Sequence, residues 1–362
     1  MKTLIVLLLV LLSAANSSCE EGGVSGGSGT DQDTLTGKWL VPKEKIFDGG
    51  PGKDGIPSVD EPKFLDAGQV NYLKNNDLVL GIKIGDQIRA YPHPVMNWHE
   101  IVNDSFDDGH IAITYCPLTG TGIGWDRQIM GEVTTFGVSG LLYNSNLIPY
   151  DRLTESNWAQ MLNKGIHGEM IDSEAITYTL LETTWATWKK MFPDSRVLST
   201  NTGFKRNYQH NPYDNYKEKP DLLFPVEPLD ERLFSKERVF GIIRDGQAKT
   251  YRFESFADSV TLIRDTFQEK GFIIAGSKKQ NLLVAFENQT MESRETDLQF
   301  EAVQDALPVI MKDTTGSRWN VFGEAVTGPH KGQKLKKTKS MIGFWFAWGA
   351  FYPNPSIYEN NQ

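Results

Sequence analysis

The sequence predicts a β-rich α+β protein made of two related lobes in tandem. Most of its apolar segments are short and strand-like, and few have helical spacing. The chain also repeats itself, because segment 81–91 (GIKIGDQIRAY) returns 160 residues later as 241–251 (GIIRDGQAKTY). Segment 184–198, which contains a W-x-x-W motif, returns at the same offset as 344–358. Doubled motifs at one constant offset predict an internal duplication with later divergence.

The repeat also serves as an internal control. Residues that hold up the fold should persist in both copies. Trp185 and Trp345 match in this way, so we expect them in equivalent buried positions. Cys116 falls opposite Gly276, which indicates that the fold does not require its thiol. Chemistry, if present, is therefore expected in the first copy.

The bulk composition is that of a folded, acidic protein. Of the 362 residues, 39% are hydrophobic and 11% aromatic, and the formal net charge is −9. This length is sufficient for one large core or two medium ones. The negative charge disfavours nucleic acid or an anionic membrane surface as the partner. We therefore expect no nucleic-acid partner.

Residues 1–19 are predicted to be a lipoprotein-type signal peptide. Lys2 is followed by a short apolar run and then by small residues that end at Cys19. This order predicts lipidation of Cys19, with the protein held through its lipid on the extracytoplasmic side of a bacterial cell envelope membrane. The alternative is an ordinary signal peptide cut near Ala15, because Asn16 replaces the usual Leu or Val of a lipobox.

The remainder divides into four predicted parts. Residues 20–60 are rich in glycine and proline and are expected to form a flexible linker and extended arm. Residues 61–200 form the first lobe, with the candidate site. Residues 201–235 connect the lobes and, being long and rich in Tyr, Asn and Pro, should pack across the first lobe. Residues 236–358 form a second, degenerate lobe.

Local signals give the elements of the first lobe. A Gly-Asp pair between two apolar runs predicts a β-hairpin over 77–91. Pro94 predicts the start of a short helix. An apolar strand should end at Cys116. Thr184 predicts the N-cap of a helix that Pro193 terminates.

Cys116 and His99 are the strongest candidates for chemistry. His99 falls opposite Ser259 in the second copy, so it too is specific to the first. A strand, a turn around 107–109 and a return strand separate the two residues. We expect this hairpin to bring the sulfur within about 4 Å of an imidazole nitrogen. A thiolate and an imidazole would bind copper or zinc, or would form an activated nucleophile.

Other residues are candidates to complete this site. Asp126 and His93 are expected to finish the metal shell, and the pocket is expected to include Trp98, Trp125, Tyr115 and Asp151. Each of the two aspartates precedes an arginine at the end of a strand-like segment. Turn caps or ion pairs are the alternative roles for them. The sequence has no P-loop or H-E-x-x-H motif.

These residues lie in motifs that resemble a prokaryotic family of unknown function, domain-of-unknown-function family 3179. The likeness covers roughly residues 62–358. It rests on six motifs, namely Y-P…W-H-E-I-V-N-D at 91–104, Y-C-P-L at 115–118, W-D-R at 125–127, Y-D-R at 150–152, R-N-Y-x-x-N-P-Y at 206–213 and F-W-F-A-W at 344–348. The resemblance implies no settled activity. Many members have C-P-L-C where this chain has Thr119, so a dithiol cycle or two-cysteine metal clamp would have to rely on Cys116 alone.

Two main functions stay open from the sequence. The leading hypothesis is a lipid-anchored extracytoplasmic protein with a mononuclear Cys/His metal site, or a thiol site, in the first lobe. The alternative is a non-catalytic surface lipoprotein that binds a glycan or small ligand in an aromatic cleft between the lobes, with Cys116 structural. A scaffold without chemistry is a third reading. Whether the protein is an enzyme is left open.

Overall fold

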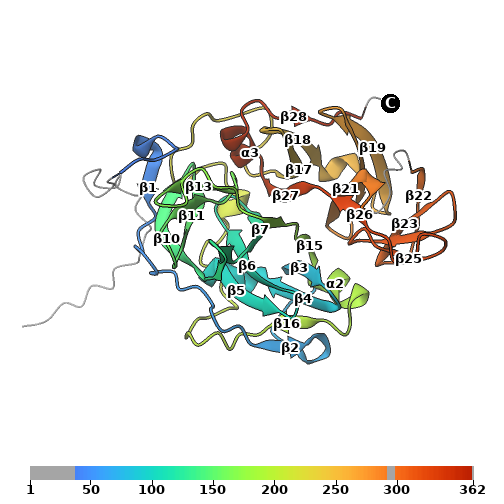
Figure 1. Ribbon diagram of the computed structural model, residues 1–362, viewed down its shortest axis with the longest axis horizontal. Coiled ribbons are helices and arrows are strands. Elements are labelled where there is room, and N and C mark those ends of the chain that lie inside the picture. Colours follow the sequence, from blue (N-terminus) through green and yellow to red (C-terminus); the bar gives the residue numbers. More distant parts are fainter. Residues whose placement is uncertain (1–36, 292–297, 361–362) are drawn as a thin grey trace, which may run out of the picture.

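The computed structural model describes residues 37–291 and 298–360, and it confirms a β-rich α+β fold (Figure 1). The predicted signal peptide and Cys19 lie outside the described residues. In the two described ranges, no helix combines the length and apolarity needed to cross a membrane.

The N-terminal half forms three main sheets. The first has the order β15-β3-β4-β16-β2, with bounds Leu181–Thr184, Leu78–Ile84, Gln87–Pro92, Arg196–Leu198 and Phe64–Asp66. The second has the order β14-β7-β6-β5, with bounds Thr177–Tyr178, Thr121–Asp126, Gly109–Cys116 and Ile101–Phe106. The third has the order β1-β10-β11-β12-β13, with bounds Ile46–Asp48, Phe136–Tyr143, Asn146–Asp151, Asn157–Ala159 and Lys164–His167. A small ribbon pairs β8 (Gln128–Ile129) with β9 (Glu132–Val133).

The described residues of the C-terminal half form three sheets of corresponding order. The first is β27-β17-β18-β28, with bounds Lys339–Phe344, Arg238–Arg244, Gln247–Arg252 and Ser356–Ile357. The second is β19-β20-β21-β26, with bounds Thr261–Phe267, Lys270–Ser277, Leu282–Thr290 and Leu335–Lys337. The third is β22-β23-β24-β25, with bounds Phe300–Ala302, Val309–Asp313, Arg318–Asn320 and Ala325–Thr327.

Short helices join these strands. Helix α1 (His93–His99) follows β4, and its Pro94 occupies the first turn, where a missing backbone N–H is tolerated. Helix α2 (Trp185–Met191) follows β15, and the side chain of Thr184 accepts a hydrogen bond from the N–H of Thr187. Both helices, and the hairpin of β3 and β4, confirm the local predictions. Helix α3 is Trp345–Phe351.

The two halves share their strand register at the offset seen in the sequence. Gly81 pairs with Ala90 between β3 and β4, and Gly241 pairs with Thr250 between β17 and β18. Helices α2 and α3 begin at the same offset, at Trp185 and Trp345. Duplication as the origin of this agreement stays a prediction.

A tryptophan packed on a bare glycine recurs in both halves. A Cβ on Gly81 would lie 1.8 Å from Cζ3 of Trp188, and a Cβ on Gly241 would lie 2.3 Å from Cη2 of Trp348. Both indoles are fully buried. Because each ring lies directly against the backbone of a strand, no side chain fits at either glycine.

The β3–β4 hairpin of the N-terminal half and the β17–β18 hairpin of the C-terminal half both pack between the two halves. One face of β3 and β4, together with α2, shares a core with C-terminal residues that include Ile273 and Trp319. Reciprocally, β17, β27 and α3 share a core with N-terminal residues that include Trp125 and Met161. In Figure 1, α3 lies on the side of the N-terminal sheets and α2 extends toward the C-terminal ones. The halves are therefore interlocked.

The arm and the connecting segment both pack on this framework. Val41 and Ile46 of the arm are buried, and β1 pairs with β10. In the connecting segment, Tyr208 is buried in a core of the N-terminal half, as the sequence led us to expect. Tyr216 and Phe224 are also buried.

Candidate ligand-binding pocket

A cavity of about 320 Å³ lies where the two halves and the connecting segment meet. Each part contributes to its wall, with His93, Tyr115 and Pro117 from the N-terminal half, Tyr208, Tyr213 and Tyr216 from the connecting segment, and Arg238 and Phe344 from the C-terminal half. Four of the six sequence motifs therefore reach the same cavity. A volume of this size is typical of a site for a small molecule.

Residues 206–217, here called the covering segment, are fastened to α1 along one side of the cavity. The indole of Trp98 donates to the carbonyl of His210 at 3.1 Å. The amide of Asn97 donates to Asn211 at 3.2 Å. The hydroxyl of Tyr213 donates to Oε1 of Glu100, just past the helix, at 3.1 Å. These three hydrogen bonds fix this part of the cavity wall to helix α1 and to the residue that follows it.

His93 lies in the wall, beside a buried ion pair that joins the halves. Its ring packs on Tyr115 with centroids 4.3 Å apart. Its Nε2 lies 3.5 Å from Oε2 of Glu182 on β15. Glu182 also forms an ion pair with Arg238 on β17. Burial raises the pKa of Glu182, but Arg238 and His93 together lower it by more than burial raises it. The net shift is therefore downward, and the carboxylate is ionised.

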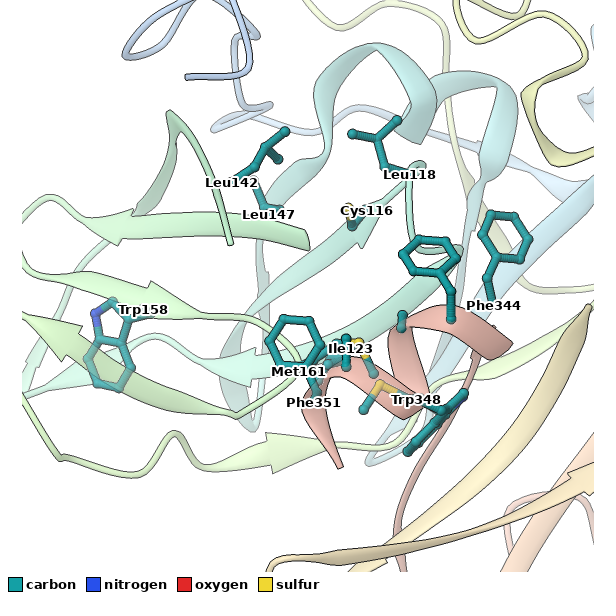
Figure 2. Close-up of a cluster of buried hydrophobic side chains, with 14 of the residues drawn as sticks. Cys116, Leu118, Ile123, Leu142, Leu147, Trp158, Met161, Phe344, Trp348 and Phe351 are labelled. Carbon is teal, nitrogen blue, oxygen red and sulfur yellow. The ribbon is translucent and has the colours of Figure 1, made fainter. Parts of the chain in front are cut away.

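Cys116 lies outside this wall and inside the core. Its side chain is 1% exposed and belongs to the apolar cluster that includes Leu118, Leu142 and Leu147 (Figure 2). The thiol donates a weak bond to the carbonyl of Ser145 at 3.6 Å. Burial, with the nearby Glu100 carboxyl as the next cause, raises the pKa of Cys116 to about 11. This environment keeps the thiol protonated.

His99 is fully buried, and both of its ring nitrogens are hydrogen-bonded to oxygen atoms of the protein. Nδ1 lies 2.7 Å from the carbonyl of Pro57, and Nε2 lies 2.7 Å from the hydroxyl of Tyr208. Burial lowers the pKa of His99, which favours the neutral ring. Because a carbonyl only accepts, Nδ1 carries the proton and Nε2 accepts from Tyr208. Neither nitrogen is directed at Cys116.

The carboxylates of the two predicted aspartates, Asp126 and Asp151, accept hydrogen bonds from nearby backbone and side-chain groups. Asp126 accepts from the N–H of Gln128 at 2.7 Å and from Tyr178 at 3.0 Å. Asp151 is fully buried and accepts from the indole of Trp158 at 2.9 Å and from the N–H of Thr154 at 2.7 Å. These contacts match the turn-cap alternative that the sequence left open.

The predicted tryptophans differ in their relation to the cavity. Trp125 is fully buried and donates to Asn163 at 2.9 Å, away from the cavity wall. Trp98 supports the covering segment. Of the eight side chains predicted around a site, His93 and Tyr115 are the two that line the cavity. Over residues 37–291 and 298–360, no group of three His, Cys, Asp or Glu side chains is arranged to hold a metal ion.

Beneath the covering segment, Glu100 is a buried acid with few partners. Its φ angle is +56°, so it ends α1 in a left-handed conformation. Burial raises the pKa of Glu100 to about 7, although the hydroxyl of Tyr213 opposes the shift. The carboxyl group is therefore partly protonated near neutral pH.

Sequence reasoning missed several of these residues. Glu182 corresponds to Ile342 and Arg238 to Leu78 at the repeat offset, so an ion pair in this position is not required by the fold. The lack of charge at both offset positions is the sequence signal for this pair. Tyr216 carries no such signal, because the connecting segment has no counterpart.

Comparison with known proteins gives one match. Residues 53–355 match the model of a family described as a protein of unknown function, DUF3179. The matched range covers both halves, the connecting segment and the whole cavity wall. No curated protein and no solved structure matches the chain.

Proposed function

This chain belongs to the DUF3179 family, and we propose that it is a binding protein of the bacterial cell envelope that takes a small ligand in the cavity. In this proposal Cys116 is structural. The single observation that carries the proposal is a cavity whose wall is assembled from both halves and from the fastened covering segment.

The architecture supports a preformed binding site. Walls held by hydrogen bonds and a buried ion pair lose little conformational freedom when a ligand enters. The aromatic rings of Tyr115, Tyr213 and Phe344 offer apolar faces, and the polar groups between them can orient a ligand.

The metal hypothesis receives less support from the geometry. Copper or zinc held by Cys116 and His99 would require His99 to give up a bond to Pro57 or Tyr208. It would also require a thiol with a raised pKa to ionise in an apolar core. This hypothesis stays a prediction, and metal analysis of the purified protein tests it.

Anchoring through Cys19 completes the proposal. The signal-like order of residues 1–19 supports an attached lipid, which needs no transmembrane helix. The folded part would then face the extracytoplasmic space, where the cavity could capture a ligand.

Binding can be tested by thermal denaturation of the purified protein with a panel of sugars, amino acids, nucleosides and small carboxylic acids. A ligand at one hundred times its Kd should raise the Tm by about 4 °C. Two exposed asparagines give a matched pair of variants. Asn76→Trp obstructs the cavity and should abolish the shift, whereas Asn201→Trp lies away from it and should retain the shift. A panel without any shift, or shifts that survive Asn76→Trp, would count against the proposal.

A further inference from the structure

Two polar atoms in the cavity wall lack a hydrogen-bond partner within the described part of the chain. The hydroxyl of Tyr216 is buried and makes no hydrogen bond. Nε2 of His93 is also buried without a hydrogen bond, and it lies 3.5 Å from Oε2 of Glu182. Tyr115, which is 6% exposed, also lines the cavity. These three groups line one cavity.

Buried polar groups without partners are uncommon in folded proteins, because the hydrogen bonds that they lose to water are not replaced. Two such atoms in the wall of one cavity, the Tyr216 hydroxyl and Nε2 of His93, indicate that a bound molecule supplies the missing partners. Tyr213, also in the wall, provides a contrast, because its hydroxyl is satisfied by Glu100 at 3.1 Å.

The charges at this end of the cavity are already paired. Glu182 is bound by Arg238 and faces His93. Arg238 in turn donates to Asn281 at 2.7 Å. Lys74 and Lys217 also line the cavity, but both are exposed to solvent, where their charges are screened. Among the described residues that line the cavity, no buried charge is therefore left unpaired for an ionic ligand.

The unpaired groups suit a ligand with hydroxyls. Burial raises the pKa values of Tyr115 and Tyr216, which keeps both phenols neutral. A neutral phenol can donate one hydrogen bond and accept another, as a ligand hydroxyl can. The flat faces of Tyr213 and Phe344 can stack on the C–H face of a ring.

We propose that the cavity binds a neutral, hydroxyl-bearing ring, the chemistry of a saccharide unit, through Tyr115, Tyr216 and His93. This inference rests on the proposed binding function and adds the class of ligand. The complementarity comes from neutral donors and acceptors, with the apolar ring faces accommodated by the aromatic wall.

The proposal separates binding from stability at two tyrosines of the same wall. Tyr216→Phe removes a hydroxyl that has no protein partner, so the Tm of the free protein should stay unchanged or rise. Tyr213→Phe removes a hydroxyl bonded to Glu100, so the Tm should fall. A fall in Tm for Tyr216→Phe equal to that for Tyr213→Phe would show that its hydroxyl already has a partner, and would overturn the proposal.

The ligand class is tested by isothermal titration of the purified full-length protein with neutral mono- and disaccharides, and separately with carboxylates and phosphate esters of similar size. We expect a saccharide to bind, and Tyr216→Phe to weaken it about 5- to 15-fold. Tyr143→Phe, outside the cavity, should leave binding unchanged.

Binding of anionic compounds alone would overturn the ligand class and leave the binding function standing. Saccharide binding that Tyr216→Phe leaves intact would place the ligand elsewhere and overturn the inference. Absence of binding by every class would overturn both proposals.

Discussion

Cys116 should resist alkylation while the protein is folded. Its pKa is raised to about 11, and its side chain is 1% exposed. Relative to a free cysteine of pKa about 8.5, the thiolate fraction near pH 7.5 should be lower by about 300-fold. Burial adds a second barrier, because the reagent cannot reach the sulfur without local opening. The expected rate is therefore at least about 300-fold below that of an exposed thiol.

Mass spectrometry after iodoacetamide treatment measures this rate. The chain has 2 cysteines, so a Cys19→Ser background leaves Cys116 as the single thiol. The reference is Ser259→Cys in a background where both natural cysteines are replaced, because position 259 is exposed. Cys116 should react at the reference rate after unfolding in guanidinium chloride. Rapid reaction of the folded protein would refute the structural role and would favour the thiol hypothesis.

Three further predictions concern packing, pH and anchoring. In urea denaturation, Gly81→Ala should lower the free energy of unfolding by about 3 kcal/mol, because its Cβ would overlap a buried indole. The control Gly109→Ala meets open space and should change the free energy of unfolding by less than about 0.5 kcal/mol. The pKa of Glu100 is raised to about 7 in the folded state, so ionisation of this carboxyl group opposes folding. The free energy of unfolding of the wild-type protein, measured relative to that of Glu100→Gln, should therefore fall by up to about 3 kcal/mol between pH 5 and pH 8. A difference that does not change with pH would contradict this assignment. Cys19→Ala should release the protein from membranes or stall its processing in cell fractionation, and soluble wild-type protein would contradict lipidation.

The elements that could be predicted from the sequence are those whose causes are local. The Gly-Asp turn sets the β3 and β4 hairpin, and the Thr184 cap sets the start of α2. The hairpin of β5 and β6 that ends at Cys116 was also expected, and it brings the N–H of Tyr115 to 2.7 Å from the carbonyl of Glu100. Backbone proximity at that end follows from strand pairing alone.

The directions of the side chains at the site depend on distant residues. His99 is held by Pro57 and Tyr208, which are 42 and 109 positions away in the sequence. Alternation along β6 places Tyr115 at the cavity and Cys116 in the core. The cavity itself needs Arg238 from the other half, and no spacing in the N-terminal motifs indicates that partner.

The interlocked hairpins also limit how this protein can be divided. A chain ending near residue 200 would leave the α2 side of the first hairpin without the C-terminal residues that share its core. The converse fragment would leave α3 without its N-terminal neighbours. Neither half is thus a module that could be transplanted or inherited alone, and the smallest unit that recombination can exchange intact is the entire pair together with its connecting segment.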